Sequence, residues 1–97
     1  MHVRLHDEAD GELSEAAAYL ERERPGYGEK FVAAFIHERD LLLAYPKIGE
    51  RCGHRARRTL IQGFRYDIIY RLDADEIFVV AIAHHSRRPN YWIPRLR

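Results

Sequence analysis

The residues best suited to chemistry lie close to the C-terminal end of the sequence. Two histidines, two arginines and two aromatic residues gather there: His84, His85, Arg87, Arg88, Tyr91 and Trp92. Metal-independent cleavage of RNA needs a base for the 2′-hydroxyl, cations for the phosphate and an acid for the leaving oxygen. If the protein is a nuclease, the residue types that meet these needs are Arg58, Arg65, His84 and Tyr91.

Each candidate also has a structural interpretation. A histidine at the end of a strand, such as His84, often only forms hydrogen bonds that hold the local fold. Aromatic rings carry a large apolar area that a small domain rarely exposes. We therefore expect Tyr91 and Trp92 to pack back on the sheet and fix the C-terminus. Successive strand residues point to opposite faces, so we do not expect His84 and His85 in one cleft.

Other kinds of site are not indicated. A zinc site built from His54, His84 and His85 would lack the spaced cysteine and histidine ligands of structural zinc sites. A single cysteine, Cys52, excludes an intrachain disulfide and fits a reducing compartment. We therefore expect neither a metal ion nor a cofactor.

Charge is unevenly distributed, although the net charge is only +1. Residues 1–50 contain 11 acidic and 6 basic side chains, whereas residues 51–97 contain 4 acidic and 10 basic ones. Most of the bases are arginine, which suits carboxylates, phosphates and aromatic faces. The basic half predicts an anionic partner, either nucleic acid or an acidic peptide, with an ordinary solvated surface as the alternative.

The elements that must position these residues follow from apolar patterning. A chain of 97 residues supports one core, so we expect a single domain spanning residues 1–97. The patterns predict helices over 7–24, with Asp7 as N-cap, and over 27–44; they predict strands over 2–6, 57–62, 65–72 and 76–84, with a loop over 47–56.

This order, β-α-α-β-β-β, predicts an α+β fold. The short link at Pro25 and Gly26 implies a helical hairpin, packed on one face of a mostly antiparallel four-stranded sheet. Residues 77–83 are apolar at every position, so their strand should be central and covered on both faces. The second helix carries a surplus apolar stripe, Val32, Ile36 and Leu43, that lacks an obvious partner within the chain.

Nothing in the sequence indicates a membrane or secreted protein. No apolar run approaches the ~20 residues of a membrane helix, and the first residues have no signal-peptide core. We therefore expect a cytoplasmic protein.

Several segments together resemble one family. The most specific are Phe-Arg-Tyr-Asp-Ile-Ile-Tyr-Arg and Ala-His-His-Ser-Arg-Arg-Pro-Asn-Tyr-Trp, joined by Arg-Pro-Gly-Tyr-Gly-Glu-Lys-Phe and Tyr-Pro-Lys-Ile-Gly. Across residues 3–92 the chain resembles the RelE/ParE superfamily of bacterial toxins and is most similar to the ParE-type, or plasmid stabilisation, branch. The resemblance implies the toxin of a type II toxin–antitoxin pair, neutralised by a cognate antitoxin protein.

The resemblance also implies one of two targets. RelE-like relatives cleave mRNA at the ribosome, whereas ParE-like relatives inhibit DNA gyrase. The RNA-cleaving relatives carry lysines and arginines on the sheet, and an arginine where this chain has His85. Here the only lysines are Lys30 and Lys47, neither on the predicted sheet. These departures favour gyrase inhibition by protein contact, with a ribosome-dependent mRNA endoribonuclease as the alternative and a toxin fold without toxicity as a third interpretation.

Two sets of contacts follow from this interpretation. We expect the target to contact Arg87, Arg88, Tyr91 and Trp92. We expect the antitoxin to contact Val32, Ile36, Leu43, Arg58 and Arg71, because disordered antitoxin tails tend to be acidic and the arginines supply the complementary charge.

Overall fold

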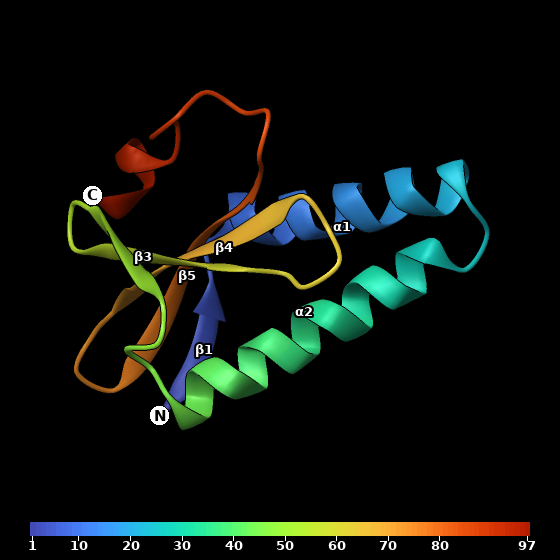
Figure 1. Cartoon of the computed structure of the whole chain (residues 1–97). Coiled ribbons are helices and arrows are strands. Elements are labelled where there is room, and N and C mark those ends of the chain that lie inside the picture. Colours follow the sequence, from blue (N-terminus) through green and yellow to red (C-terminus); the bar gives the residue numbers. More distant parts are fainter.

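A helical hairpin lies on one face of a five-stranded sheet in the computed structural model, which describes residues 1–97 (Figure 1). None of its helices is long and apolar enough to cross a membrane. The predicted α+β class is confirmed. In chain order the elements are β1 (His2–Leu5), α1 (Asp7–Glu23), α2 (Tyr27–Ala44), β2 (Glu50–Gly53), β3 (Ala56–Leu60), β4 (Tyr66–Leu72), β5 (Glu76–His84) and the 3₁₀ helix η1 (Ile93–Leu96).

The sheet has the order β1-β5-β4-β3-β2, with β1 parallel to β5 and every other pair antiparallel. The prediction of four strands is wrong, because β2 forms inside the segment expected to be a loop. The four residues of β2 are mostly exposed and show no apolar alternation, so only backbone pairing with β3 makes this strand.

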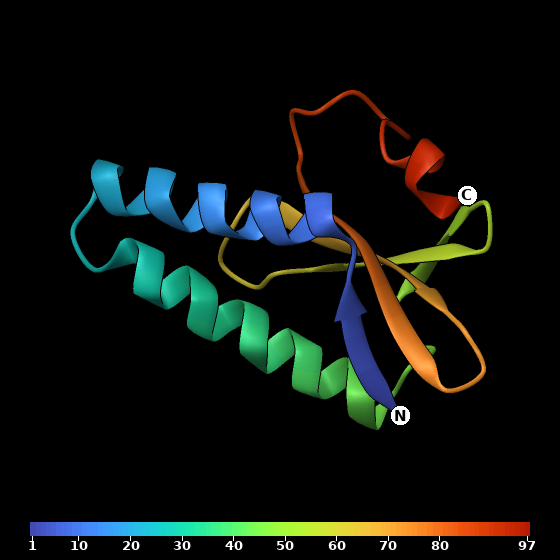
Figure 2. The ribbon, with the colours of Figure 1, turned by 180° about the vertical axis from the view of Figure 1, so that it is seen from behind.

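Strand β5 is the centre of the molecule, as its unbroken apolar run predicts. All residues from Ile77 to Ile82 are at most 5% exposed. Side chains on one face of the sheet pack against both helices in the larger core, which includes Phe31 and Leu42. The opposite face holds a smaller core around Ile69, Val80 and Trp92. The chain beyond β5 arches back over this second face toward the β2–β3 hairpin (Figure 2).

Helix α1 begins at Asp7, one residue earlier than a cap at Asp7 would require. His6 is the N-cap, and its Nδ1 accepts a hydrogen bond from the backbone N–H of Glu8 at 3.1 Å. The backbone N–H of His6 donates to the carbonyl of Val79 at 2.9 Å, which extends the β1–β5 pairing by one residue. The predicted N-cap is therefore wrong, because sheet pairing keeps the chain extended through His6.

The two helices touch closely where the hairpin turns. The Glu21 carboxylate accepts hydrogen bonds from the backbone N–H groups of Gly26 and Gly28, at 2.9 and 3.0 Å. A Cβ atom at Gly28 would lie 2.5 Å from the carbonyl oxygen of Ala17, whereas one at Gly11 would meet nothing within 4 Å. Close helix approach therefore requires glycine at position 28 and not at position 11.

The two glycines give a matched pair of substitutions. Gly28→Ala should lower the free energy of unfolding by about 2 kcal/mol, since the backbone of α1 must move aside. Gly11→Ala should raise it by about 0.5–1 kcal/mol, because alanine is the better residue inside a helix. Urea unfolding followed by circular dichroism measures both values. A Gly28→Ala variant as stable as the parent would contradict the close contact.

Candidate functional site

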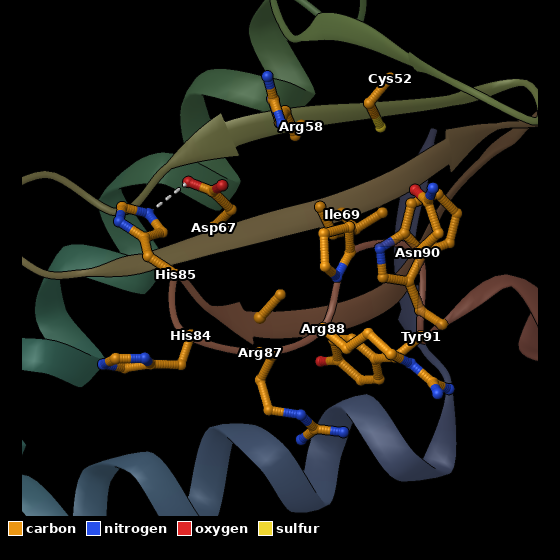
Figure 3. Close-up of a pocket in the computed structure, with 13 residues that line it drawn as sticks. Cys52, Arg58, Asp67, Ile69, His84, His85, Arg87, Arg88, Asn90 and Tyr91 are labelled. Atoms are coloured by element: carbon orange, nitrogen blue, oxygen red, sulfur yellow. Dashed lines mark hydrogen bonds and ion pairs between the residues drawn. The ribbon is translucent and has the colours of Figure 1, made fainter.

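The segment that follows β5 builds a cleft on the sheet face opposite the helices. Trp92 anchors this segment: its ring is 4% exposed and packs in the smaller core. Asn90 adopts a positive φ of 63° and its carbonyl accepts a hydrogen bond from the backbone N–H of Ile93, which turns the chain back. The resulting cleft, which we name the rim cleft, has a volume of about 380 Å³ and extends from Cys52 and Arg58 across β4 to residues 84–92 (Figure 3).

Glu12 and Arg95 fasten this segment to the sheet. Strand β1 covers only the first part of β5, so the later edge of β5 has no neighbouring strand. There the backbone N–H of Ile82 donates to Glu12 Oε1 at 3.0 Å, and the carbonyl of Val80 accepts from Arg95 Nη1 at 3.1 Å. The two side chains also bind each other, at 2.8 and 3.1 Å. An ion pair thus takes the place of the missing strand.

Tyr91 is bound to the same ion pair. Its hydroxyl donates to Glu12 Oε2 at 2.7 Å. The guanidinium of Arg87 lies 3.8 Å from the centre of the Tyr91 ring, and its Nη1 is 3.7 Å from Glu12. Tyr91 and Arg87 are therefore held in fixed positions beside the cleft.

These contacts set the protonation states. Burial by itself would raise the pKa of Glu12, but hydrogen bonds from Arg95, Tyr91 and the Ile82 backbone outweigh it and hold the pKa below its ordinary value of 4.5. Burial, and then the hydrogen bond to Glu12, raise the pKa of the Tyr91 hydroxyl far above its usual range. At neutral pH Glu12 is ionised and Tyr91 keeps its proton.

The two histidines point away from each other, as strand alternation predicts (Figure 3). Both nevertheless line the rim cleft, so the expectation that they would not share one cleft is wrong; the cleft lies at the end of β5, where residues of the following turn also reach it. His84 bends back on its own turn: its Nδ1 lies 2.7 Å from Ser86 Oγ and accepts the Ser86 N–H at 3.0 Å, while its ring meets Tyr66 edge-on. His85 Nε2 lies 3.1 Å from Asp67 Oδ1. His84 therefore has a local structural partner, whereas His85 has a carboxylate partner across the strands.

Cations surround the cleft. Arg58 on β3 pairs with Glu50 on the neighbouring strand. Arg88 is exposed and has no acidic partner, while Arg87 is held on Tyr91. The guanidinium groups at the cleft therefore differ in how firmly they are held: Arg58 and Arg87 have partners within the protein, whereas Arg88 has none.

The four nuclease candidates are not all brought together. Arg58, His84 and Tyr91 line the rim cleft, but Arg65, in the turn before β4, does not. Among the expected target contacts, Arg87, Arg88 and Tyr91 line the cleft with exposed atoms. Trp92 also lines the cleft, but it is almost fully buried and packs in the smaller core beneath the segment.

The residues expected to bind the antitoxin lie on separate surfaces. Val32 and Ile36 line a shallow apolar hollow between the exposed sides of α1 and α2, together with three alanines and Gly28; we name it the hairpin groove. Ile36 is 39% exposed, and Leu43, also exposed, lies outside this groove toward the end of α2. These apolar side chains remain available to a partner.

The two arginines expected to bind the antitoxin lie away from the groove. Arg58 is on the opposite sheet face. Arg71 is occupied within the protein: it binds Asp73 at 2.8 and 3.1 Å and donates to the Leu96 carbonyl at 3.2 Å. One partner that reached all these residues would have to wrap around the molecule.

No three histidine, cysteine, aspartate or glutamate side chains come together in a way that would hold a metal ion. His54 instead lies on the β2–β3 hairpin, edge-on to Trp92 with ring centres 6.5 Å apart.

Comparison with known proteins places this geometry in a family. A family model described as the ParE toxin of the type II toxin–antitoxin system, parDE, matches residues 3–89. The chain belongs to the ParE toxin family. Among solved structures it is similar to one described as the chromosomal ParDE TA system from P. aeruginosa, with a TM-score of 0.75 and 15% identity over 87% of this chain and 95% of that chain. At that identity the likeness concerns the fold. A search of curated proteins found no match.

Three site residues of this toxin were not predicted from its sequence: Glu12, Asp67 and Arg95. Glu12 looked like one of several acids at the start of a helix. A usable signal existed, since Glu12 lies between Ala9 and Ala16 on the side of α1 that faces the core. A charge in that position needs a buried partner. Nothing comparable in the sequence points to Asp67 or Arg95.

The Glu12 contacts predict a stability change that depends on pH. Glu12→Gln should lower the free energy of unfolding at neutral pH by about 2 kcal/mol, because the largely buried Arg95 loses the less exposed of its two carboxylate partners and keeps only Glu8, at 2.9 Å. The pKa of Glu12 is lower in the folded toxin than its ordinary 4.5, so its ionised form stabilises the fold above that pH. This stabilisation is lost as the pH falls through the folded-state pKa.

Urea unfolding across acidic and neutral pH measures this difference. The parent should lose stability toward acid more steeply than Glu12→Gln, so that the two curves converge. Glu15→Gln is the matched control, since Glu15 is exposed on the same helix and forms no ion pair. Parallel curves for the parent and Glu12→Gln would contradict the assigned role of Glu12.

Proposed function

We propose that this ParE toxin inhibits DNA gyrase by protein–protein contact through the rim cleft, and that a cognate antitoxin neutralises it. Membership of the ParE family supports the general role. The observation that carries the choice of target is the hydrogen bond from Tyr91 to Glu12 at 2.7 Å. A nuclease would need Tyr91, or one of the histidines that precede it at positions 84 and 85, to exchange a proton with RNA. Here the Tyr91 proton is already held by a carboxylate.

The cleft is better suited to binding than to proton transfer. Arg87 is fixed over the Tyr91 ring, and Arg88 projects without a partner. A fixed guanidinium next to an aromatic ring is typical of the residues that dominate protein interfaces. Guanidinium groups bind carboxylates with two parallel hydrogen bonds, so the complementary surface of gyrase should carry acidic side chains.

The Arg88 side chain gives a direct test of this proposal. Arg88→Gln should weaken inhibition of gyrase supercoiling about tenfold, because it removes one charge-assisted hydrogen bond. Such a bond contributes about 1.4 kcal/mol to the binding free energy. Arg22→Gln, an equally exposed change of charge on α1, should inhibit like the parent. Purified gyrase, relaxed plasmid and a titration of toxin suffice for the measurement. Failure of the parent toxin to inhibit gyrase at any concentration would refute the proposal.

A second candidate function, ribosome-dependent mRNA cleavage, is favoured by one observation. His85 and Asp67 form a histidine–carboxylate pair at 3.1 Å, and Arg58 lines the same cleft. A carboxylate that orients an imidazole is a common arrangement for a general base. This would place the base at His85 and not at the predicted His84.

Induction in cells separates the two functions. Codon-phased mRNA ends that disappear in His85→Gln would establish the nuclease. DNA breaks that depend on gyrase, with intact mRNA, would establish gyrase poisoning. Normal growth on induction without an antitoxin would indicate a toxin fold without toxicity.

The hairpin groove is the surface that we assign to the antitoxin. Val32 and Ile36 line it, and the exposed Leu43 would extend the contact along α2. A contact with Arg58 would require the antitoxin to continue around the molecule to the opposite sheet face. When an amphipathic helix of a partner binds in such a groove, the apolar side chains of that helix usually supply most of the binding energy.

Two charges in the groove should therefore abolish neutralisation without unfolding the toxin. The double variant Val32→Asp/Ile36→Asp should bind the antitoxin at least about thirtyfold more weakly, which corresponds to about 2 kcal/mol. Lys30→Asp/His37→Asp is the matched control on the same helix, because neither residue lines the groove. Isothermal titration measures the affinities and circular dichroism checks the fold. Equal losses in the two variants would rule out the groove as the docking surface.

A further inference from the structure

A third surface lies where α2 runs into the β2–β3 hairpin. Tyr45 and Ile48, between these elements, are 63% and 56% exposed. The next residues along the chain surround a hollow of about 500 Å³ lined by Arg51, Arg55 and Arg57, with no acidic residue in its wall. Tyr45 and Ile48 line a separate hollow, and Arg57 joins the two because it binds the backbone on either side of Ile48. We name these five residues the arginine–tyrosine surface.

The backbone of this surface is firmly held. Arg57 Nη1 donates to the carbonyls of Lys47 and Gly49, at 3.1 and 2.8 Å. The Tyr70 hydroxyl donates to the Pro46 carbonyl at 2.7 Å and accepts the Gly49 N–H at 3.0 Å. The segment that carries Tyr45 and Ile48 is thus bound to the sheet, while these two side chains stay outside the core.

Arg51 and Arg55 belong to the eight arginines that take no part in the ion pairs of the toxin. Arg4, Arg39, Arg58, Arg71, Arg87 and Arg95 each lie beside a carboxylate. Arg51 and Arg55 are exposed and have no such neighbour. Their positive charge remains available to an anionic group of another molecule.

The hairpin tip is also under strain. His54 and Arg55 form a two-residue turn in which both φ angles are positive, 54° and 62°. Glycine or asparagine normally occupies these positions, because other side chains are strained there. The two-residue hairpin itself requires these angles. The turn presents the guanidinium of Arg55 at the edge of the hollow.

We propose that the arginine–tyrosine surface docks an acidic peptide segment of a partner protein. An apolar side chain of the peptide would rest on Tyr45 and Ile48, while its carboxylates bind Arg51 and Arg55. Exposed tyrosine and arginine side chains are enriched at protein interfaces, and an aliphatic residue such as Ile48 offers nothing to a phosphate backbone. This surface shares no residue with the rim cleft or the hairpin groove.

Fluorescence anisotropy with the whole toxin tests the proposal. The probe is a labelled peptide of alternating glutamate and leucine, with alternating glutamine and leucine as the neutral comparison. Arg51→Gln/Arg55→Gln should weaken binding of the acidic peptide about tenfold, because two exposed charge contacts are lost together. Tyr45→Ser should weaken it several-fold. Arg22→Gln/Lys30→Gln removes the same charge elsewhere, and Tyr19→Ser removes another half-exposed tyrosine; both should bind like the parent.

Three outcomes would overturn the proposal. The first is no binding of the acidic peptide by the parent toxin. The second is an equal loss in the variants and their controls, which would mean attraction by overall charge. The third is a DNA duplex that binds more tightly and displaces the peptide, which would identify a nucleic-acid surface.

Arg55→Gly separates recognition from folding. Glycine removes the strain of the turn, so the midpoint of thermal unfolding should rise by about 3 °C. Affinity for the acidic peptide should fall at the same time. A variant that gains stability and keeps its affinity would show that Arg55 plays no part in docking.

Discussion

The ion pair between Glu12 and Arg95 is the interaction on which the functional end of this toxin depends. Strand β1 is only four residues long, so the edge of the central strand would otherwise expose unpaired backbone groups. An unpaired backbone group away from water is costly. A carboxylate from α1 and a guanidinium from the C-terminal helix satisfy these groups together, and thereby join the two ends of the sequence.

This arrangement decides what the neighbouring side chains can do. Because Glu12 stays ionised, it holds the Tyr91 hydroxyl as a donor, and Arg87 is attracted to the same carboxylate. Tyr91 and Arg87 are therefore held in place, which supports the proposed binding role over a role in proton transfer. The pair of His85 and Asp67, across the cleft, is the one arrangement nearby with acid–base character.

Because charge is uneven along the sequence, the folded protein has surfaces of different charge. The acidic first half forms the helical hairpin, whose outer groove is apolar. The arginine-rich second half forms the strands and the C-terminal segment, which present guanidinium groups on both sides of the sheet. Under the proposed function, the target and the antitoxin bind to surfaces with different chemistry.

The sequence by itself determined the two helices, the central strand and the mostly antiparallel sheet, because each leaves an apolar pattern of its own period. It also located the basic and aromatic cluster of residues 84–92. Strand β2 and the N-cap His6 were not predicted, because backbone pairing and not side-chain pattern produces them. Only the tertiary structure decided that Glu12, Tyr91 and Arg95 meet and that Arg65 lies outside the cleft. These relations depend on how segments some 80 residues apart pack together, which no local pattern encodes.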